Sequence, residues 1–64
     1  MTKNEIEILE SQYNLIARQK AGTEGELASC LGWELMGIDT VLFVLGYHAV
    51  ETEGVYKIQK IVEG

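Results

Sequence analysis

The segment TEGELASCLGW, residues 23–33, decides the fold of this 64-residue chain together with the apolar residues that follow as far as Leu45. Ala28 and Gly32 lie four residues apart, which suits a close helix crossing followed by a tight turn. The apolar positions around that turn would bury one common seam; they are Leu27, Leu31, Trp33, Ile38 and Val41. The segment therefore predicts one helix that ends near Gly32 and another that begins after it.

The residues before this segment predict a long first helix, from about residue 3 to about residue 20. Thr2 and Glu5 have the T-x-x-E spacing of a capping box at its start. One apolar stripe follows helical spacing: Ile6, Leu9, Tyr13, Ile16 and Ala17. Thr23 and Glu26 repeat the capping-box spacing, so we expect Thr23 to cap the second helix.

The last part of the chain predicts a β-hairpin. Residues 48–52 and 55–61 are rich in β-branched and aromatic side chains and flank the turn residues Glu53 and Gly54. Residues 41–47 are open to two interpretations, because a short apolar run suits a buried strand as well as a helix. If the second helix closes at Gly37, this run would be a strand. Asp39 and Thr40 as helix caps favour a third helix.

The central segment resembles the winged helix-turn-helix superfamily. Members show Ala at the fifth and Gly at the ninth position of the motif, with apolar residues at the fourth, eighth and tenth and branched ones near the fifteenth and eighteenth. Counted from Glu24, these positions hold Leu27, Ala28, Leu31, Gly32, Trp33, Ile38 and Val41. The resemblance implies a single α+β domain over residues 1–64, with three helices followed by a two-stranded hairpin, the wing. Gly37 and the absence of a Ser or Thr cap before the third helix depart from the family pattern.

Composition limits the classes of function. The net charge of −5 disfavours nucleic acid as a partner, because phosphate contacts need clustered Lys and Arg. We expect no membrane span, since no apolar run approaches about 20 residues, and a cytoplasmic location. One Cys and one His provide neither a disulfide nor a zinc site, so oligomerisation remains the common way to stabilise so small a core.

The predicted third helix suggests a protein interface. Its side opposite the core is apolar where a DNA-reading relative carries polar and basic residues. An exposed apolar patch on a small acidic domain is typical of a protein contact. We therefore predict a non-enzymatic binding module that forms a homodimer or binds a protein partner. Its expected interface comprises Met36, Phe43, Val44 and Tyr47, assisted by Ile8 and Leu15 of the first helix.

Two alternatives remain. The first is a DNA-binding transcriptional regulator that uses Arg18, Lys20, Lys57 and Lys60, although the expected wing tip, residues 51–54, is acidic. The second, supported only by charge and size, is an acidic mimic that blocks a nucleic-acid-binding protein. We expect no enzyme and no cofactor, because no catalytic pair, phosphate-binding glycine loop or metal-ligand spacing stands out.

Overall fold

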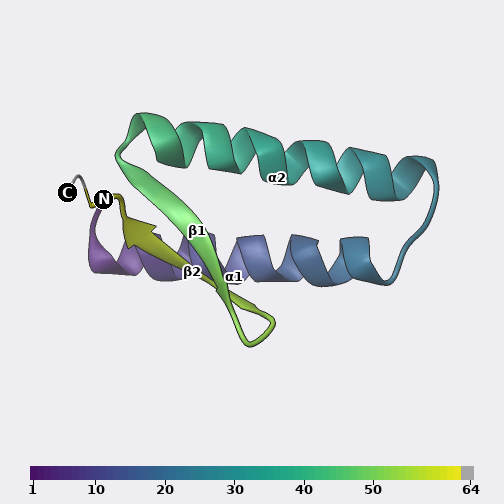
Figure 1. Cartoon of the computed structure of the whole chain (residues 1–64), viewed down its shortest axis with the longest axis horizontal. Coiled ribbons are helices and arrows are strands. Elements are labelled where there is room, and N and C mark those ends of the chain that lie inside the picture. The colour runs from purple at the N-terminus through teal and green to yellow at the C-terminus, as the bar shows by residue number, and fades with distance from the viewer. Residues whose placement is uncertain (63–64) are drawn as a thin grey trace.

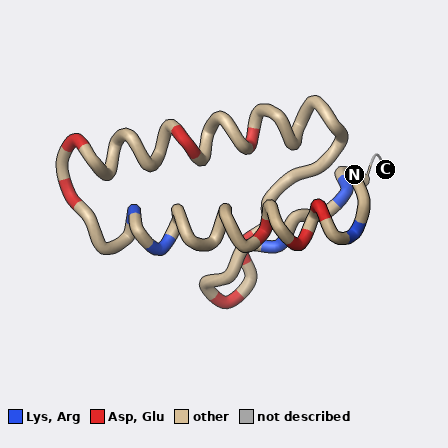
Figure 2. The backbone as a smooth tube through the Cα atoms, turned by 180° about the vertical axis from the view of Figure 1, so that it is seen from behind, with Lys and Arg blue, Asp and Glu red and all other residues tan. Residues whose placement is uncertain are grey.

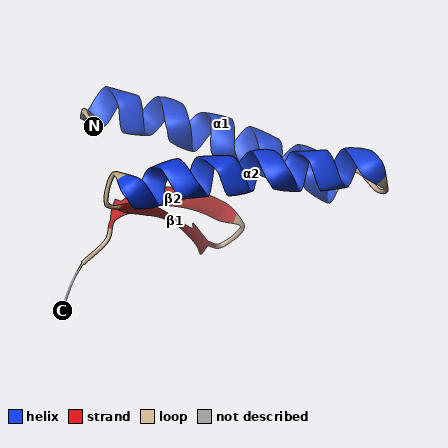
Figure 3. Ribbon diagram, turned by 90° about the horizontal axis from the view of Figure 1, so that it is seen from above, coloured by secondary structure: helices blue, strands red, loops and turns tan. Residues whose placement is uncertain are grey.

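The computed structural model describes residues 1–62 and contains two helices followed by a β-hairpin. Helix α1 spans Lys3–Ala21 and α2 spans Glu26–Val44; strands β1 and β2 span Tyr47–Thr52 and Val55–Lys60. The helices run side by side in opposite directions, and the hairpin lies across one side of the pair (Figures 1 and 3). The α+β class is therefore confirmed, but the prediction of three helices is wrong.

Helix α1 begins as its sequence predicts. The Thr2 hydroxyl accepts a hydrogen bond from the Glu5 backbone N–H at 3.1 Å, and Glu5 Oε1 accepts one from the Thr2 N–H at 2.7 Å. These bonds hold the pKa of the Glu5 carboxyl below its usual value, because they favour the ionised form. The capping box therefore fixes the helix start.

Helix α2 continues through Gly32 and Gly37, where the sequence suggested a turn or an end. Its inner residues Leu31, Leu35 and Leu42 keep helical spacing across both glycines. One glycine inside a helix costs only about 1 kcal/mol, which packing along this stripe offsets. Gly32 also gives room to α1: a Cβ built there would lie 3.2 Å from Lys20 Cε. The helix-turn-helix expected here is a single helix.

The start of α2 also differs from the prediction. The residue that precedes the helix is Gly25, at φ 77°, and no side chain caps the first turn. A positive φ suits glycine, so the chain reverses at Gly25 and the helix begins at Glu26. The capping box expected from Thr23 and Glu26 does not form.

The hairpin is confirmed, with strand ends within one residue of those predicted. The strands are antiparallel, with Thr52 opposite Val55 and Tyr47 opposite Lys60. Glu53 and Gly54 both have positive φ, 53° and 81°, as a two-residue type I′ turn requires. Of the ambiguous run, residues 41–44 are helical and only Tyr47 belongs to a strand.

Polar side chains of α1 attach the hairpin. The Asn14 amide donates to the Tyr56 carbonyl at 2.9 Å, and its oxygen accepts the Tyr56 N–H at 2.8 Å. One turn earlier, Glu10 Oε1 accepts the Ile58 N–H at 2.9 Å. In a regular antiparallel pair, alternate residues point their N–H and C=O groups away from the partner strand. Asn14 and Glu10 bind such groups of β2, so α1 satisfies this edge of the hairpin as a third strand would.

The buried core is small. Within the described chain its buried hydrophobic residues are Tyr13, Leu31, Leu42 and Ile58, of which only Leu42 is fully buried. The Tyr13 and Tyr56 rings pack at a centroid distance of 4.9 Å and an angle of 54°. Leu31 lies nearer the loop that joins the helices, whereas Tyr13 packs on Tyr56 of the hairpin. The core therefore runs between the helices and covers only one side of each.

Candidate interaction surface

Helix α2 has apolar side chains both on the side that faces the core and on the side that faces away from it. At about 100° per residue, Trp33 and Val44 project roughly opposite the buried Leu42, and Met36 and Phe43 lie beside them. The exposed fractions are 71% for Trp33, 64% for Met36, 73% for Phe43 and 77% for Val44. We call these four side chains, with Thr40 between them, the outer face of α2.

No charge interrupts the outer face. The Thr40 hydroxyl donates to the Met36 carbonyl at 2.8 Å, so its polar group is satisfied within the helix. After Glu26 the helix carries only Glu34 and Asp39 as charged residues (Figure 2). Neither belongs to the outer face, so that face offers apolar contact from Trp33 to Val44.

Asp39 is held on the inner side of α2 by α1. The Tyr13 hydroxyl donates to both of its carboxylate oxygens, at 3.0 and 3.2 Å. Burial and this carboxylate both disfavour the phenolate, so they raise the pKa of Tyr13 well above its usual value. The charge of Asp39 therefore serves the contact between the helices.

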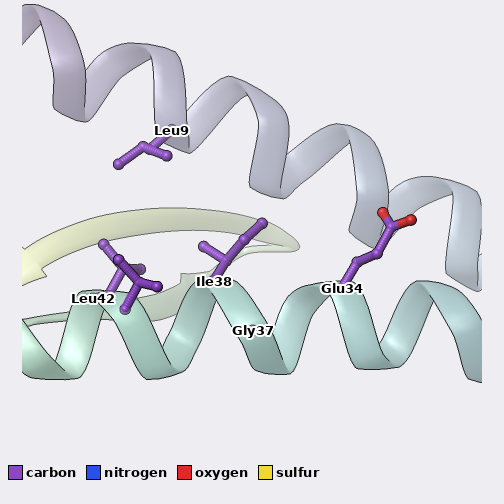
Figure 4. A pocket seen from close by; sticks show the side chains of 6 residues that line it. Leu9, Glu34, Gly37, Ile38 and Leu42 are labelled. Atoms are coloured by element: carbon purple, nitrogen blue, oxygen red, sulfur yellow. The ribbon is translucent and has the colours of Figure 1, made fainter.

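An apolar groove adjoins the outer face. The groove runs between the helices on the side away from the hairpin. Figure 4 shows the hairpin behind the residues that line the groove. Its volume is about 470 Å³, and its lining residues are Leu9, Glu34, Gly37, Ile38, Val41 and Leu42. Val41 is 59% exposed, so apolar surface continues from the groove around α2 toward the outer face.

The structure brings together only part of the predicted interface. Met36, Phe43 and Val44 share the outer face, and Tyr47 at the start of β1 lines a hollow beside Phe43. Ile8 and Leu15 are 56% and 47% exposed on α1. They lie about 140° and 160° around α1 from the buried Tyr13 and are no part of the outer face.

Three residues that were expected in the core are exposed. Trp33 is 71% exposed, and Leu27 and Val41 are each 59% exposed. The reason is the missing turn: because α2 continues through Gly32, Trp33 is carried to the side opposite Leu42. The signal that would have placed Trp33 correctly is the unbroken helical spacing of the inner stripe.

The basic residues do not form one patch. Arg18 and Lys57 line the same hollow, which also contains the carboxylate of Glu10. Lys20 lies against Gly32 of α2, whereas Lys60 is at the far end of β2 (Figure 2). This arrangement lacks the row of positive charge that follows a nucleic-acid backbone.

No protein-family model matches the sequence, and no match to it was found among curated proteins or solved structures. The resemblance to winged helix proteins therefore depends on the sequence motif alone. Among residues 1–62, no three His, Cys, Asp or Glu side chains are grouped to hold a metal ion.

By length and composition alone, α2 is able to cross a membrane. No membrane span was expected from the sequence, because no uninterrupted apolar run approaches about 20 residues.

Proposed function

We propose that this protein is a non-enzymatic binding module that acts through protein contacts on the outer face of α2. The observation that carries the proposal is a 19-residue helix with apolar residues on all sides, of which α1 and the hairpin cover only one. A helix that is apolar all round is normally buried within a larger structure. The outer face therefore calls for a partner.

The residues on this face are those that contribute most at interfaces. Trp and Phe are aromatic anchors, and Met adapts to irregular contacts. An aromatic side chain buries about 150–250 Å² when fully enclosed, at about 25 cal/mol per Å². Trp33 and Phe43 are more than two-thirds exposed, so covering them supplies much of the binding free energy.

A protein surface explains this helix better than a lipid bilayer. Glu34 and Asp39 lie in its middle part, and an acidic residue at the centre of a spanning helix costs about 2.5–3.5 kcal/mol. Helices that lie on membrane surfaces usually carry Lys or Arg on their polar side, but α2 has neither. The helix starts instead with Glu26, preceded by Glu24, and anionic lipids repel such a segment.

Site-specific photo-crosslinking in cells tests the proposal. A photoreactive amino acid replaces Phe43, and the matched control replaces Leu15, an exposed apolar residue on α1. We expect protein adducts from position 43 that are absent from position 15. Adducts to lipid alone, or the same pattern from both positions, would contradict a protein-binding role for the outer face.

A further inference from the structure

We infer that the partner is a second copy of this chain, and that the two α2 helices pack antiparallel through their outer faces. This inference rests on the proposed function and names its partner. Three observations carry it: the amount of surface that the single chain exposes, the spacing of residues along α2, and the placement of its charges.

The surface area matches what a dimer requires. A compact protein of 7.1 kDa exposes about 4,100 Å², by the scaling of surface with mass. This chain exposes 4887 Å², which is roughly 800 Å² more. A stable interface buries about 800 Å² on each partner. Self-association therefore brings the exposed surface per chain down to that of a compact domain or below it.

Stability favours a second copy over a partner that binds only occasionally. Among the described residues the core comprises the four buried side chains named above, and a core of this size is usually too small to stabilise a domain by itself. Cys30 is the only cysteine, so no disulfide within the chain reinforces the fold. A copy of the chain is available wherever the protein is made, and its binding stabilises the folded state by mass action.

The outward side of α2 has the spacing of a helix-packing seam. Cys30, Trp33, Gly37, Thr40 and Val44 follow one another at intervals of three, four, three and four residues. Alternation of this kind places side chains along one line that a second helix meets. Nothing lies within 4 Å of a Cβ built at Gly37, so the seam has a notch there, one turn after the largest side chain, Trp33.

Charge selects the antiparallel arrangement. Glu24 and Glu26 lie at the start of α2, and no basic residue accompanies them in the helix. A parallel pair would bring these acidic residues of both copies together, which is unfavourable. An antiparallel pair separates them by about 28 Å, the length of 19 helical residues. With the two-fold axis near residue 35, Trp33 of each copy lies over Gly37 of the other.

Sedimentation of the purified full chain provides the first test. We expect a species of twice the 7.1 kDa chain mass at micromolar concentration. Trp33→Glu, which places a charge on the seam, should convert it to a monomer, and Leu15→Glu should leave it dimeric, because Leu15 is outside the outer face. A chain that stays monomeric, with or without vesicles of phosphatidylcholine and phosphatidylglycerol, would overturn the inference.

Disulfide formation under mild oxidation tests the orientation. Single cysteines are compared at position 30, which is native, and in Cys30→Ser backgrounds that carry Gly37→Cys, Thr40→Cys or Val44→Cys. An antiparallel pair predicts fastest crosslinking at position 37, near the axis, and little at positions 30 and 44. Similar rates at all four positions would indicate a parallel pair and overturn the proposed geometry.

Gly37→Cys fills the notch and weakens the dimer if the packing there is tight. A second variant therefore keeps Gly37: Thr40→Cys with native Cys30. In the antiparallel pair it links position 30 of one copy to position 40 of the other, and peptide mapping identifies that link. Absence of this link in a chain that sediments as a dimer would contradict the arrangement.

These tests separate the two proposals. A monomeric chain that still gives protein adducts from position 43 in cells would refute the second-copy inference and leave the binding role intact. A monomeric chain without such adducts would refute both.

Discussion

The two helices have the same length, 19 residues, but they differ in what lies away from the core. Helix α1 has mostly polar side chains there, with Ile8 and Leu15 among them, and on the side that faces the hairpin its Glu10 and Asn14 satisfy the backbone of β2. Helix α2 has Trp33 and Phe43, largely exposed, and offers only Asp39 to a polar contact with α1. The core-facing stripe makes each segment a helix. The side opposite that stripe decides whether all the apolar surface of the helix is covered within one chain.

The largest expected effect comes from comparing a buried residue on the inner side of α2 with an exposed residue on its outer face. Leu42 is 1% exposed, and Leu42→Ala should lower the free energy of unfolding by about 2–5 kcal/mol at every protein concentration. Val44, which is 77% exposed, is the matched position. Val44→Ala should be nearly neutral in dilute protein and become destabilising as the chain associates. Urea denaturation at several concentrations measures both; a Val44→Ala effect independent of concentration would contradict the covered outer face.

The next effect tests how α1 holds the hairpin. Asn14→Leu should lower the free energy of unfolding by about 2–4 kcal/mol, because each buried polar group left without a partner costs about 1–3 kcal/mol. The affected groups are the N–H and C=O of Tyr56. Asn14→Asp keeps an acceptor for the N–H and should cost less. Hydrogen exchange at the Tyr56 amide checks the cause: protection unchanged in Asn14→Leu would show that the bond does not matter.

The contact between the helices should depend on pH. Tyr13→Phe removes the hydrogen bonds to Asp39 and should cost about 1.5–3 kcal/mol at about pH 8. Because folding raises the pKa of Tyr13 above its ordinary value of 10.0, the wild type binds this proton more tightly when folded. Its contribution is complete below pH 10.0 and falls as pH rises further. Urea denaturation from about pH 8 to about pH 11 should show the free energies of unfolding of the wild type and Tyr13→Phe converging. A difference that stays constant would refute the coupling between the Tyr13 proton and folding.

The smallest effect compares the two helix starts. Thr2→Ala should destabilise the protein by about 1 kcal/mol, because the Thr2 hydroxyl accepts the Glu5 N–H. Thr23→Ala should have little effect, since no side chain caps α2. Thermal unfolding of both variants gives the comparison. Equal losses would mean that Thr23 caps α2 in solution.

The elements with local signals were predictable. The capping box of Thr2 and Glu5 placed the start of α1, and the positive-φ turn at Glu53 and Gly54 placed the hairpin. Each signal involves residues close together in the chain, and its energy does not depend on distant contacts. The signals around Gly32 failed for the opposite reason. A glycine permits a turn without requiring one, and α2 continues through Gly32 with Leu31 and Leu42 both buried on its inner side.

The candidate interaction surface was likewise predictable where it depends on local spacing and unpredictable where it depends on packing between elements. The sequence by itself determined that Met36, Phe43 and Val44 are apolar and lie on one side of a helix, because residue spacing sets that side. Only the tertiary structure decided that Trp33 joins them and that Ile8 and Leu15 do not, since this depends on where α1 and the hairpin cover α2. It also decided that Asn14 and Glu10 bind β2, 42 and 48 residues further along the chain. Periodicity within one segment gives the sides of a helix, but only the other elements determine which side is buried.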